Sequence, residues 1–114
     1  MKREYTAAGG REVFLSFEAG DALHAYLRLR LKDGAPARVR ELRVVGELVP
    51  LGRADRGIQH RGLGTALLAE AEAVAAGEGF GRIAVTTGVG VRDYYRRRGY
   101  RPEGMYMAKD LARE

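Results

Sequence analysis

The chain has 114 residues, of which 46% are hydrophobic, and its 20 Lys and Arg against 15 Asp and Glu give a formal net charge of +5. This length suits one compact domain, expected to span residues 1–114, and the absence of cysteine excludes disulfides, thiolate metal sites and a cysteine nucleophile, so no metal is expected. No apolar stretch approaches the ~20 residues of a membrane-spanning helix and the first residues lack an apolar signal segment, so a cytoplasmic protein with no membrane contact is expected.

Three strands are predicted in the first half of the chain. Residues 12–17 and 22–31 alternate between apolar and polar side chains, and the turn between them makes an antiparallel hairpin the expected arrangement. A third strand is predicted from Arg38 to about Val45. Residues 46–58 contain three glycines and a proline and are predicted to form a loop.

The second half of the chain alternates between helices and strands. Apolar residues at three- and four-residue steps predict a helix from Leu63 to about Ala76, ended by Gly77 and Gly79. A short β-branched strand follows at 83–87, then a helix at 91–98 closed by Gly99, and a last strand at 105–111. The order β-β-β-α-β-α-β predicts an α/β (α+β) fold on a mixed sheet.

A glycine-rich motif, Gln59-His60-Arg61-Gly62-Leu63-Gly64, stands just before the predicted long helix. Two glycines two positions apart at a helix start expose backbone amides and remove the Cβ atoms that would block a phosphate, and the helix dipole attracts an anion there. An ordinary glycine-containing turn explains the same residues equally well. The pattern is neither a P-loop nor the dinucleotide-binding motif.

A second motif, Tyr94-Tyr95-Arg96-Arg97-Arg98-Gly99-Tyr100, falls on the predicted short helix. Adjacent helix positions face about 100° apart. One of the two tyrosines is therefore expected to pack on the sheet, while the phenol of the other faces a cleft as a proton donor. The arginines here form either a solubilising surface or a site for an anionic partner.

Together the two motifs resemble those of the GNAT acetyltransferases. Segments 40–42, 49–50, 59–64, 88–95 and 104–107 closely resemble the acetyltransferase domain of the Elongator catalytic subunit. The resemblance covers nearly the whole chain. It implies a mixed, mostly antiparallel sheet flanked by helices, acetyl-CoA as co-substrate, and a link to modification of the wobble uridine of tRNA. A histone acetyltransferase role has also been attributed to that family.

The resemblance also implies residue roles. It places the pyrophosphate of CoA on the amides of Arg61 to Thr65, with Gln59 opening that loop, and the pantetheine arm along the strand from Leu42. Tyr95 matches the position of the general acid, and Tyr94 is the second candidate. The expected cofactor contacts are Leu42, Arg43, Val44, Gln59, His60, Arg61, Gly62, Leu63, Gly64, Thr65 and Tyr95.

A general base is harder to assign. Glu41 is the most plausible carboxylate for deprotonating an amine, although a carboxylate at this place more often pairs with an arginine, and Arg40 and Arg43 are close in sequence. His24 and His60 are weaker candidates, better explained as surface or phosphate-contacting side chains.

The chain departs from the family pattern in lacking cysteine. Elongator-type proteins carry a radical S-adenosylmethionine domain with a three-cysteine cluster, so this chain is expected to be an excised domain or a free-standing relative, with that domain as a separate partner. Where many GNAT enzymes place an asparagine that touches CoA, the residue is Gly88, as in the Elongator branch. tRNA is expected to contact Arg92, Arg96, Arg97 and Arg98.

Two alternatives stay open. One is a stand-alone N-acetyltransferase for a protein lysine or a small amine. The other is a non-catalytic RNA-binding module, ranked third because the aromatic residues are not expected to form a stacking platform on a sheet face.

Overall fold

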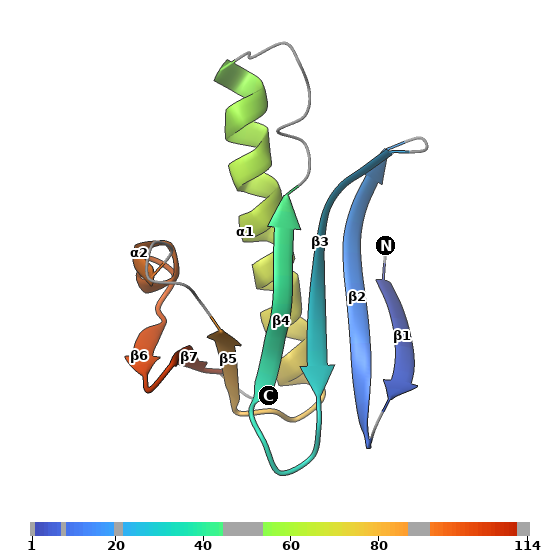
Figure 1. The fold of residues 1–114 in the computed structure, drawn as a ribbon, viewed down its shortest axis with the longest axis vertical. Helices are drawn as coiled ribbons and strands as arrows, with labels where there is room; N and C mark the ends of the chain where they lie inside the picture. The colour runs from blue at the N-terminus through green and yellow to red at the C-terminus, as the bar shows by residue number, and fades with distance from the viewer. Residues whose placement is uncertain (1, 8, 20–21, 45–53, 87–91, 112–114) are drawn as a thin grey trace.

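The computed structural model describes residues 2–7, 9–19, 22–44, 54–86 and 92–111. Within them lies one seven-stranded sheet of order β1-β2-β3-β4-β5-β7-β6. Only β4 and β5 pair in parallel, which confirms the expected mixed, mostly antiparallel sheet (Figure 1). The strands are β1 (Lys2–Ala7), β2 (Gly10–Ala19), β3 (Ala22–Leu31), β4 (Ala37–Val44), β5 (Arg82–Thr86), β6 (Arg101–Glu103) and β7 (Tyr106–Asp110), and the helices are α1 (Ala54–Gly77) and α2 (Arg92–Arg96).

The core lies between one face of the sheet and α1. The predicted hairpin is confirmed, with β2 and β3 antiparallel and Leu15 opposite Leu27. The inward-facing residues of these strands are buried against α1, which contributes Leu68 and Ala71 from its inner side. Figure 1 shows α1 running along the sheet behind β4 and β3.

Two strands were not predicted from the sequence. Strand β1 has exposed side chains along its described length, so it carries no alternation of apolar and polar residues, and it is held by pairing with β2. Strand β6 has only three residues, all exposed, paired with β7. Both form edges of the sheet, where backbone pairing rather than side-chain burial defines the strand.

The start of α1 corrects the sequence prediction. The helix begins at Ala54 and not at Leu63, so residues 54–58, predicted as loop, are helical, and Gly62 and Gly64 lie within the helix. Residues 46–53 are outside the described part. Extending an existing helix costs far less than starting one, so a helix anchored by core packing further along can continue back through unfavourable glycines.

The glycines predicted to close the two helices are confirmed as caps, although α2 ends at Arg96, two residues before the predicted end. Gly79, at φ 92°, follows α1, and the amide of Phe80 donates to the carbonyl of Ala75 at 2.9 Å. Gly99 has the same φ, and the amide of Tyr100 donates to the carbonyl of Tyr95 at 3.1 Å. Both are Schellman caps, which need a left-handed residue that glycine adopts without strain.

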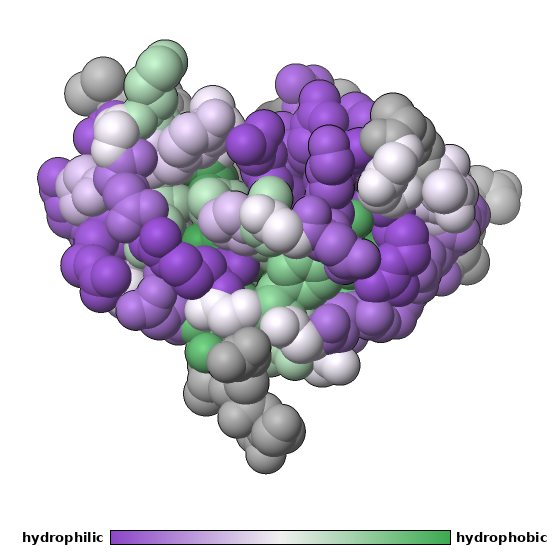
Figure 2. Space-filling model, turned by 90° about the horizontal axis from the view of Figure 1, so that it is seen from below, coloured by the Kyte–Doolittle hydropathy of each residue, from purple (hydrophilic) through white to green (hydrophobic). Residues whose placement is uncertain are grey.

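One end of the molecule presents a mainly hydrophilic face. Seen from the end of the molecule at which α1 finishes, hydrophilic residues dominate and apolar residues appear mostly in a central strip (Figure 2). Among the described helices, none is long and apolar enough to span a bilayer.

Candidate active site

Strands β4 and β5 separate partway along their length. They pair only from Ala37–Ile83 to Val39–Val85. On the β3 side, Val39 pairs with Leu29 and Glu41 with Arg28, so Arg40 is an extra residue that forms a β-bulge. A bulge bends its strand and commonly lies beside an active site. Beyond it, β4 continues to Val44, and within the described part of the chain no strand pairs with its β5 side, so this backbone edge is open among the described residues.

Helices α1 and α2 meet β4 at this open edge. Gly64 of α1 is buried, and a Cβ atom added there would lie 3.4 Å from the Tyr94 hydroxyl and 3.5 Å from Cγ2 of Val44. The next residue, Thr65, has its Oγ1 3.4 Å from the same hydroxyl. The tertiary structure therefore brings Val44, Gly64, Thr65 and Tyr94 together.

The two tyrosines of α2 occupy different environments. Tyr95 is 6% exposed and belongs to the hydrophobic core, with edge-to-face contacts to Tyr94 at 5.0 Å and Tyr100 at 5.5 Å between ring centroids. Burial, and to a smaller extent Tyr94, raises the pKa of Tyr95 to about 12. Tyr94 is half-buried, with its side chain next to α1. Tyr95 is thus the packed member of the pair, and its phenol stays protonated at neutral pH.

Arg98 links α2 to α1 through side-chain contacts, a role that was not predicted from the sequence. Its guanidinium donates to the Tyr94 carbonyl at 2.7 Å and to Oγ1 of Thr65 at 2.8 Å, and it lies 3.7 Å from the centroid of the Tyr94 ring. The four-residue spacing of Tyr94 and Arg98 is the only signal of this contact in the sequence. Of the arginines expected to contact tRNA, Arg96 and Arg97 are exposed, Arg92 is half-buried, and Arg98 turns inward.

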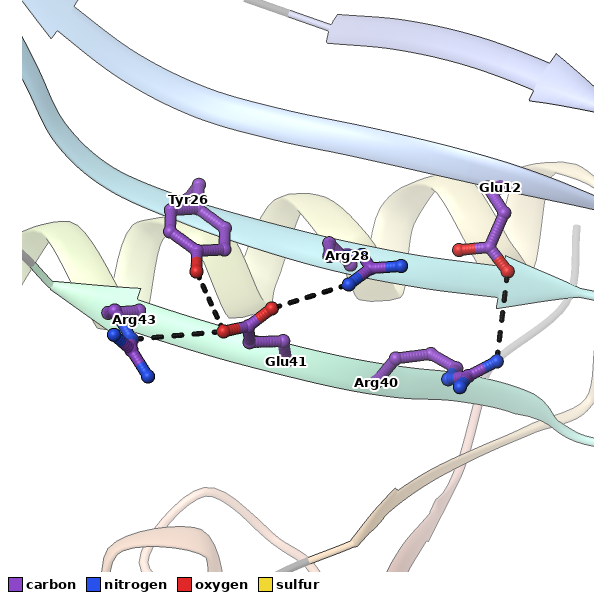
Figure 3. Close-up of polar contacts among 6 residues, drawn as sticks. All are labelled: Glu12, Tyr26, Arg28, Arg40, Glu41 and Arg43. Atoms are coloured by element: carbon purple, nitrogen blue, oxygen red, sulfur yellow. Dashed lines mark hydrogen bonds and ion pairs between the residues drawn. The ribbon is translucent and has the colours of Figure 1, made fainter.

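Glu41 lies on the opposite face of the sheet from α1 (Figure 3). Its carboxylate accepts a 2.7 Å hydrogen bond from the Tyr26 hydroxyl and forms ion pairs with Arg28 and Arg43 at 3.5 and 3.7 Å. The hydrogen bond from Tyr26 is the main reason that the pKa of Glu41 is lowered. The expected pairing with an arginine is therefore present, through Arg28 and Arg43, whereas Arg40 reaches Glu12 at 4.0 Å.

The other predicted site residues lie on β3, β4 and α1 or outside the described part of the chain. Leu42, Val44 and Leu63 pack partly buried against the core. The backbones of Gln59, His60 and Arg61 are helical, and their side chains lie outside the described part. Gly88 is also outside it. His24 is half-buried on β3. No group of acidic and histidine side chains among the described residues is placed to hold a metal ion.

The site suits the extended, amide-containing arm of acetyl-CoA better than it suits the phosphates. The edge of β4 beyond the bulge offers backbone donors and acceptors to an extended amide-containing chain, and Gly64 packs beside it, close to Val44 and the Tyr94 hydroxyl. The amides of residues 61–65 are within α1, where helical hydrogen bonds engage them. The expected phosphate cradle is therefore not preformed in this conformation.

The comparisons with known proteins agree with this geometry. The model of the Acetyltransferase (GNAT) family matches residues 3–100. The chain is 48% identical over 122 aligned positions to a tRNA uridine(34) acetyltransferase from Dehalococcoides mccartyi, covering 95% of this chain and 27% of the relative. It is 45% identical over 124 positions to human Elongator complex protein 3, covering 97% of this chain and 23% of the relative.

Solved structures show the same similarity. The archaeal Methanocaldococcus infernus Elp3 superposes with a TM-score of 0.80 at 42% identity, over 97% of this chain and 29% of that one. Tetrahymena GCN5 superposes with a TM-score of 0.66 at 13% identity, over 95% of this chain and 72% of that one, a likeness of fold alone. The chain thus spans about a quarter of the length of its Elongator-type relatives.

Proposed function

Because the chain belongs to the GNAT acetyltransferase family, we propose that it binds acetyl-CoA at the open edge of β4 and catalyses transfer of the acetyl group. The observation that carries the proposal is the separation of β4 from β5 immediately beside Gly64 and the tyrosines of α2. A strand edge, a glycine and the half-buried phenol of Tyr94 are brought to one place by three different elements.

The pantetheine arm is proposed to lie along β4 from Glu41 to Val44. An extended chain with amide groups can pair with an unpartnered strand edge as a further strand would, so backbone atoms carry the binding. Side-chain identity on β4 is then loosely constrained, apart from Leu42 and Val44, which keep the strand seated against the core.

The phosphates are proposed to contact the amides of residues 61–65, with Gln59, His60 and Arg61 beside them. This contact requires that the helix begin near Gly62 when the cofactor is bound, so that these amides become the free donors of a helix N-terminus. Glycine costs about 1 kcal/mol relative to alanine within a helix. Because Gly57, Gly62 and Gly64 all lie in the first half of α1, the cost of unwinding that segment is small.

Tyr95 is proposed as the general acid because it matches the position that the family resemblance assigns to that role, although it is the packed tyrosine of the pair and Tyr94 is the more exposed one. Acetyl-CoA supplies a thioester, and attack by a nucleophile forms a bond to the acetyl carbon as the carbon–sulfur bond breaks. The phenol of Tyr95 donates its proton to the departing sulfur, so that CoA leaves as the thiol. A pKa near 12 keeps that proton in place before the reaction. Such assistance contributes about 10²–10⁴-fold to the rate.

The acceptor is proposed to be a tRNA wobble uridine, by analogy with relatives whose names state that chemistry. The chain spans about a quarter of their length. As the family resemblance implies, the remaining steps are proposed to belong to a radical S-adenosylmethionine domain. A stand-alone N-acetyltransferase acting on a lysine or a small amine is the competing activity. Mass spectrometry of amines incubated with the chain and acetyl-CoA, without tRNA, distinguishes the two.

The direct test is calorimetric titration of the chain with acetyl-CoA. Saturable one-to-one binding is expected, with free CoA binding at the same place. Absence of any heat of binding, together with no change in melting temperature on adding acetyl-CoA, would overturn the proposal.

A further inference from the structure

The face of the sheet opposite α1 carries a concentration of arginine, here called the arginine face. Cross-strand partners lie on the same face of a sheet, so the register defines it. The pairing gives three rows of neighbouring side chains across the strands. The first row is Tyr5, Glu12, Arg30 and Arg38; the second is Arg3, Phe14, Arg28 and Glu41; the third is Ser16, Tyr26 and Arg43. Arg40, at the bulge, joins them through its contact with Glu12.

The arginine face has a strong excess of positive charge. On its described strands six arginines stand against three glutamates, namely Arg3, Arg28, Arg30, Arg38, Arg40 and Arg43 against Glu12, Glu18 and Glu41. The side chains of Arg28, Arg40 and Arg43 are 42%, 48% and 65% exposed, so ion pairing leaves much of each guanidinium in contact with solvent. Figure 3 shows these groups projecting from one side of the sheet with α1 behind it.

Aromatic rings lie among the arginines. Phe14 and Tyr26 stack with centroids 5.5 Å apart and planes 21° from parallel. Tyr5, at one end of the face, is 49% exposed, and Arg38 lies 5.1 Å above the ring of Tyr106 at the other end. Phe14 and Tyr26 lie together because strand pairing aligns residues that are distant in sequence.

The composition of the arginine face favours a nucleic acid over a protein partner. The buried centre of a protein interface is depleted of charge, whereas here charged residues occupy every row. Arginine guanidinium groups form paired hydrogen bonds with phosphates, and exposed rings stack with unpaired bases. In the described part of the chain α1 packs on the other face and α2 contacts β6, so no described helix covers these side chains.

We propose that the arginine face binds single-stranded RNA, with guanidinium groups on the phosphates and aromatic rings against the bases. This proposal rests on the proposed function, because the RNA would be the strand that carries the acetyl acceptor. It assigns the RNA contact to the sheet and not to the arginines of α2.

The test is fluorescence anisotropy of a labelled single-stranded oligouridine titrated with the chain at several salt concentrations, in the absence of acetyl-CoA. The double variant Arg3→Gln/Arg40→Gln should reduce the slope of log affinity against log salt by about 1.4, at ~0.7 per lost phosphate contact on a single strand. Tyr5→Ser should weaken binding about tenfold at constant salt slope, since stacking on one ring is worth ~1–3 kcal/mol.

The matched control is Arg96→Gln/Arg97→Gln, which removes the same charge from α2 and should leave the slope unchanged. An equal or greater loss in this control would overturn the proposal in favour of α2. Binding of a polyglutamate peptide, but not of oligouridine, with dependence on Arg3 and Arg40 would assign the face to an acidic protein instead. Calorimetry with acetyl-CoA is separate, so its failure would count against the acetyltransferase function and not against RNA binding.

Discussion

The hydroxyl of Tyr94 lies 3.4 Å from Oγ1 of Thr65, and Arg98 donates a 2.8 Å hydrogen bond to the same oxygen. These contacts join α2, which carries both tyrosines, to α1, which carries the glycine-rich segment. The position of the proposed general acid relative to the proposed cofactor site therefore depends on a small polar cluster at the junction of the two helices.

Replacing Arg98 should loosen this junction. Arg98→Ala removes two hydrogen bonds from a charged donor and the contact with the Tyr94 ring, and should lower the free energy of unfolding by about 1–3 kcal/mol. Urea denaturation measures the change. Arg97→Ala, at an exposed position next to it, is the control and should change stability by less than ~0.5 kcal/mol. Equal effects of the two substitutions would contradict the anchoring role.

Gly62→Ala should improve stability and impair cofactor binding. Outside the helix backbone itself, no atom of the described residues lies within 4 Å of the added Cβ, so the substitution should stabilise α1 by up to ~1 kcal/mol. If binding requires this segment to unwind, the same energy lowers the affinity for acetyl-CoA about fivefold. Melting curves and calorimetry measure both effects.

Gly77→Ala provides the matched control, since its added Cβ also meets nothing within 4 Å but lies at the far end of α1. It should leave the affinity for acetyl-CoA unchanged. A Gly62→Ala variant that binds acetyl-CoA as tightly as the Gly77→Ala variant would show that residues 61–65 bind no phosphate through an unwound backbone.

Tyr95→Phe should slow acetyl transfer by about 10²–10⁴-fold without weakening acetyl-CoA binding, because only the donated proton is lost. The release of the CoA thiol measures the rate of acetyl transfer, and calorimetry measures the affinity for acetyl-CoA. Tyr94→Phe, which loses only the contact with Thr65, should have the smaller effect on the rate. The reverse order would transfer the acid role to Tyr94.

Stability should fall steeply in alkali. Burial raises the pKa of Tyr95 to about 12 and, with a hydrogen bond to Glu72, raises that of Tyr100 further. Unfolded tyrosines ionise near pH 10, so above about pH 10 the unfolded chain binds fewer protons than the folded chain and the free energy of unfolding decreases. Urea denaturation between about pH 8 and about pH 11 should show this, and Tyr100→Phe should make the decrease shallower. An unchanged pH dependence in that variant would contradict the role of Tyr100.

Glu41 is expected to act in the structure more than in proton transfer. The hydrogen bond from Tyr26 is the first cause of the lowered pKa of Glu41, and a lowered pKa makes this carboxylate a weaker base. The stabilising effect of the ionised carboxylate is therefore present above about pH 4.5 and is lost as the pH falls through the pKa of the folded state. Glu41→Gln should therefore reduce the acid sensitivity of folding and leave the transfer rate within about tenfold. A loss of several hundredfold with normal stability would identify Glu41 as the general base.

The sequence by itself determined the elements whose own side chains are buried. The two-residue alternation of β2 and β3 and the three- and four-residue spacing in the second half of α1 arise because one face of each meets the core. Gly79 and Gly99 marked the helix ends, since a left-handed cap selects glycine. The motifs around Gly64 and Tyr95 indicated the family in a similar way. Close backbone packing restricts the first position to glycine, and the expected proton donation restricts the second to tyrosine.

Only the tertiary structure decided the features that depend on partners distant in the chain. Strand β1 exists through pairing with β2, the early start of α1 follows from propagation of a helix anchored elsewhere, and the arginine face appears only once four strands are aligned. The +5 charge could be counted from the sequence, but the alignment of six of its arginines on one face of the sheet could not. Local periodicity reports the environment of a single element, whereas register and packing are set by interactions between elements.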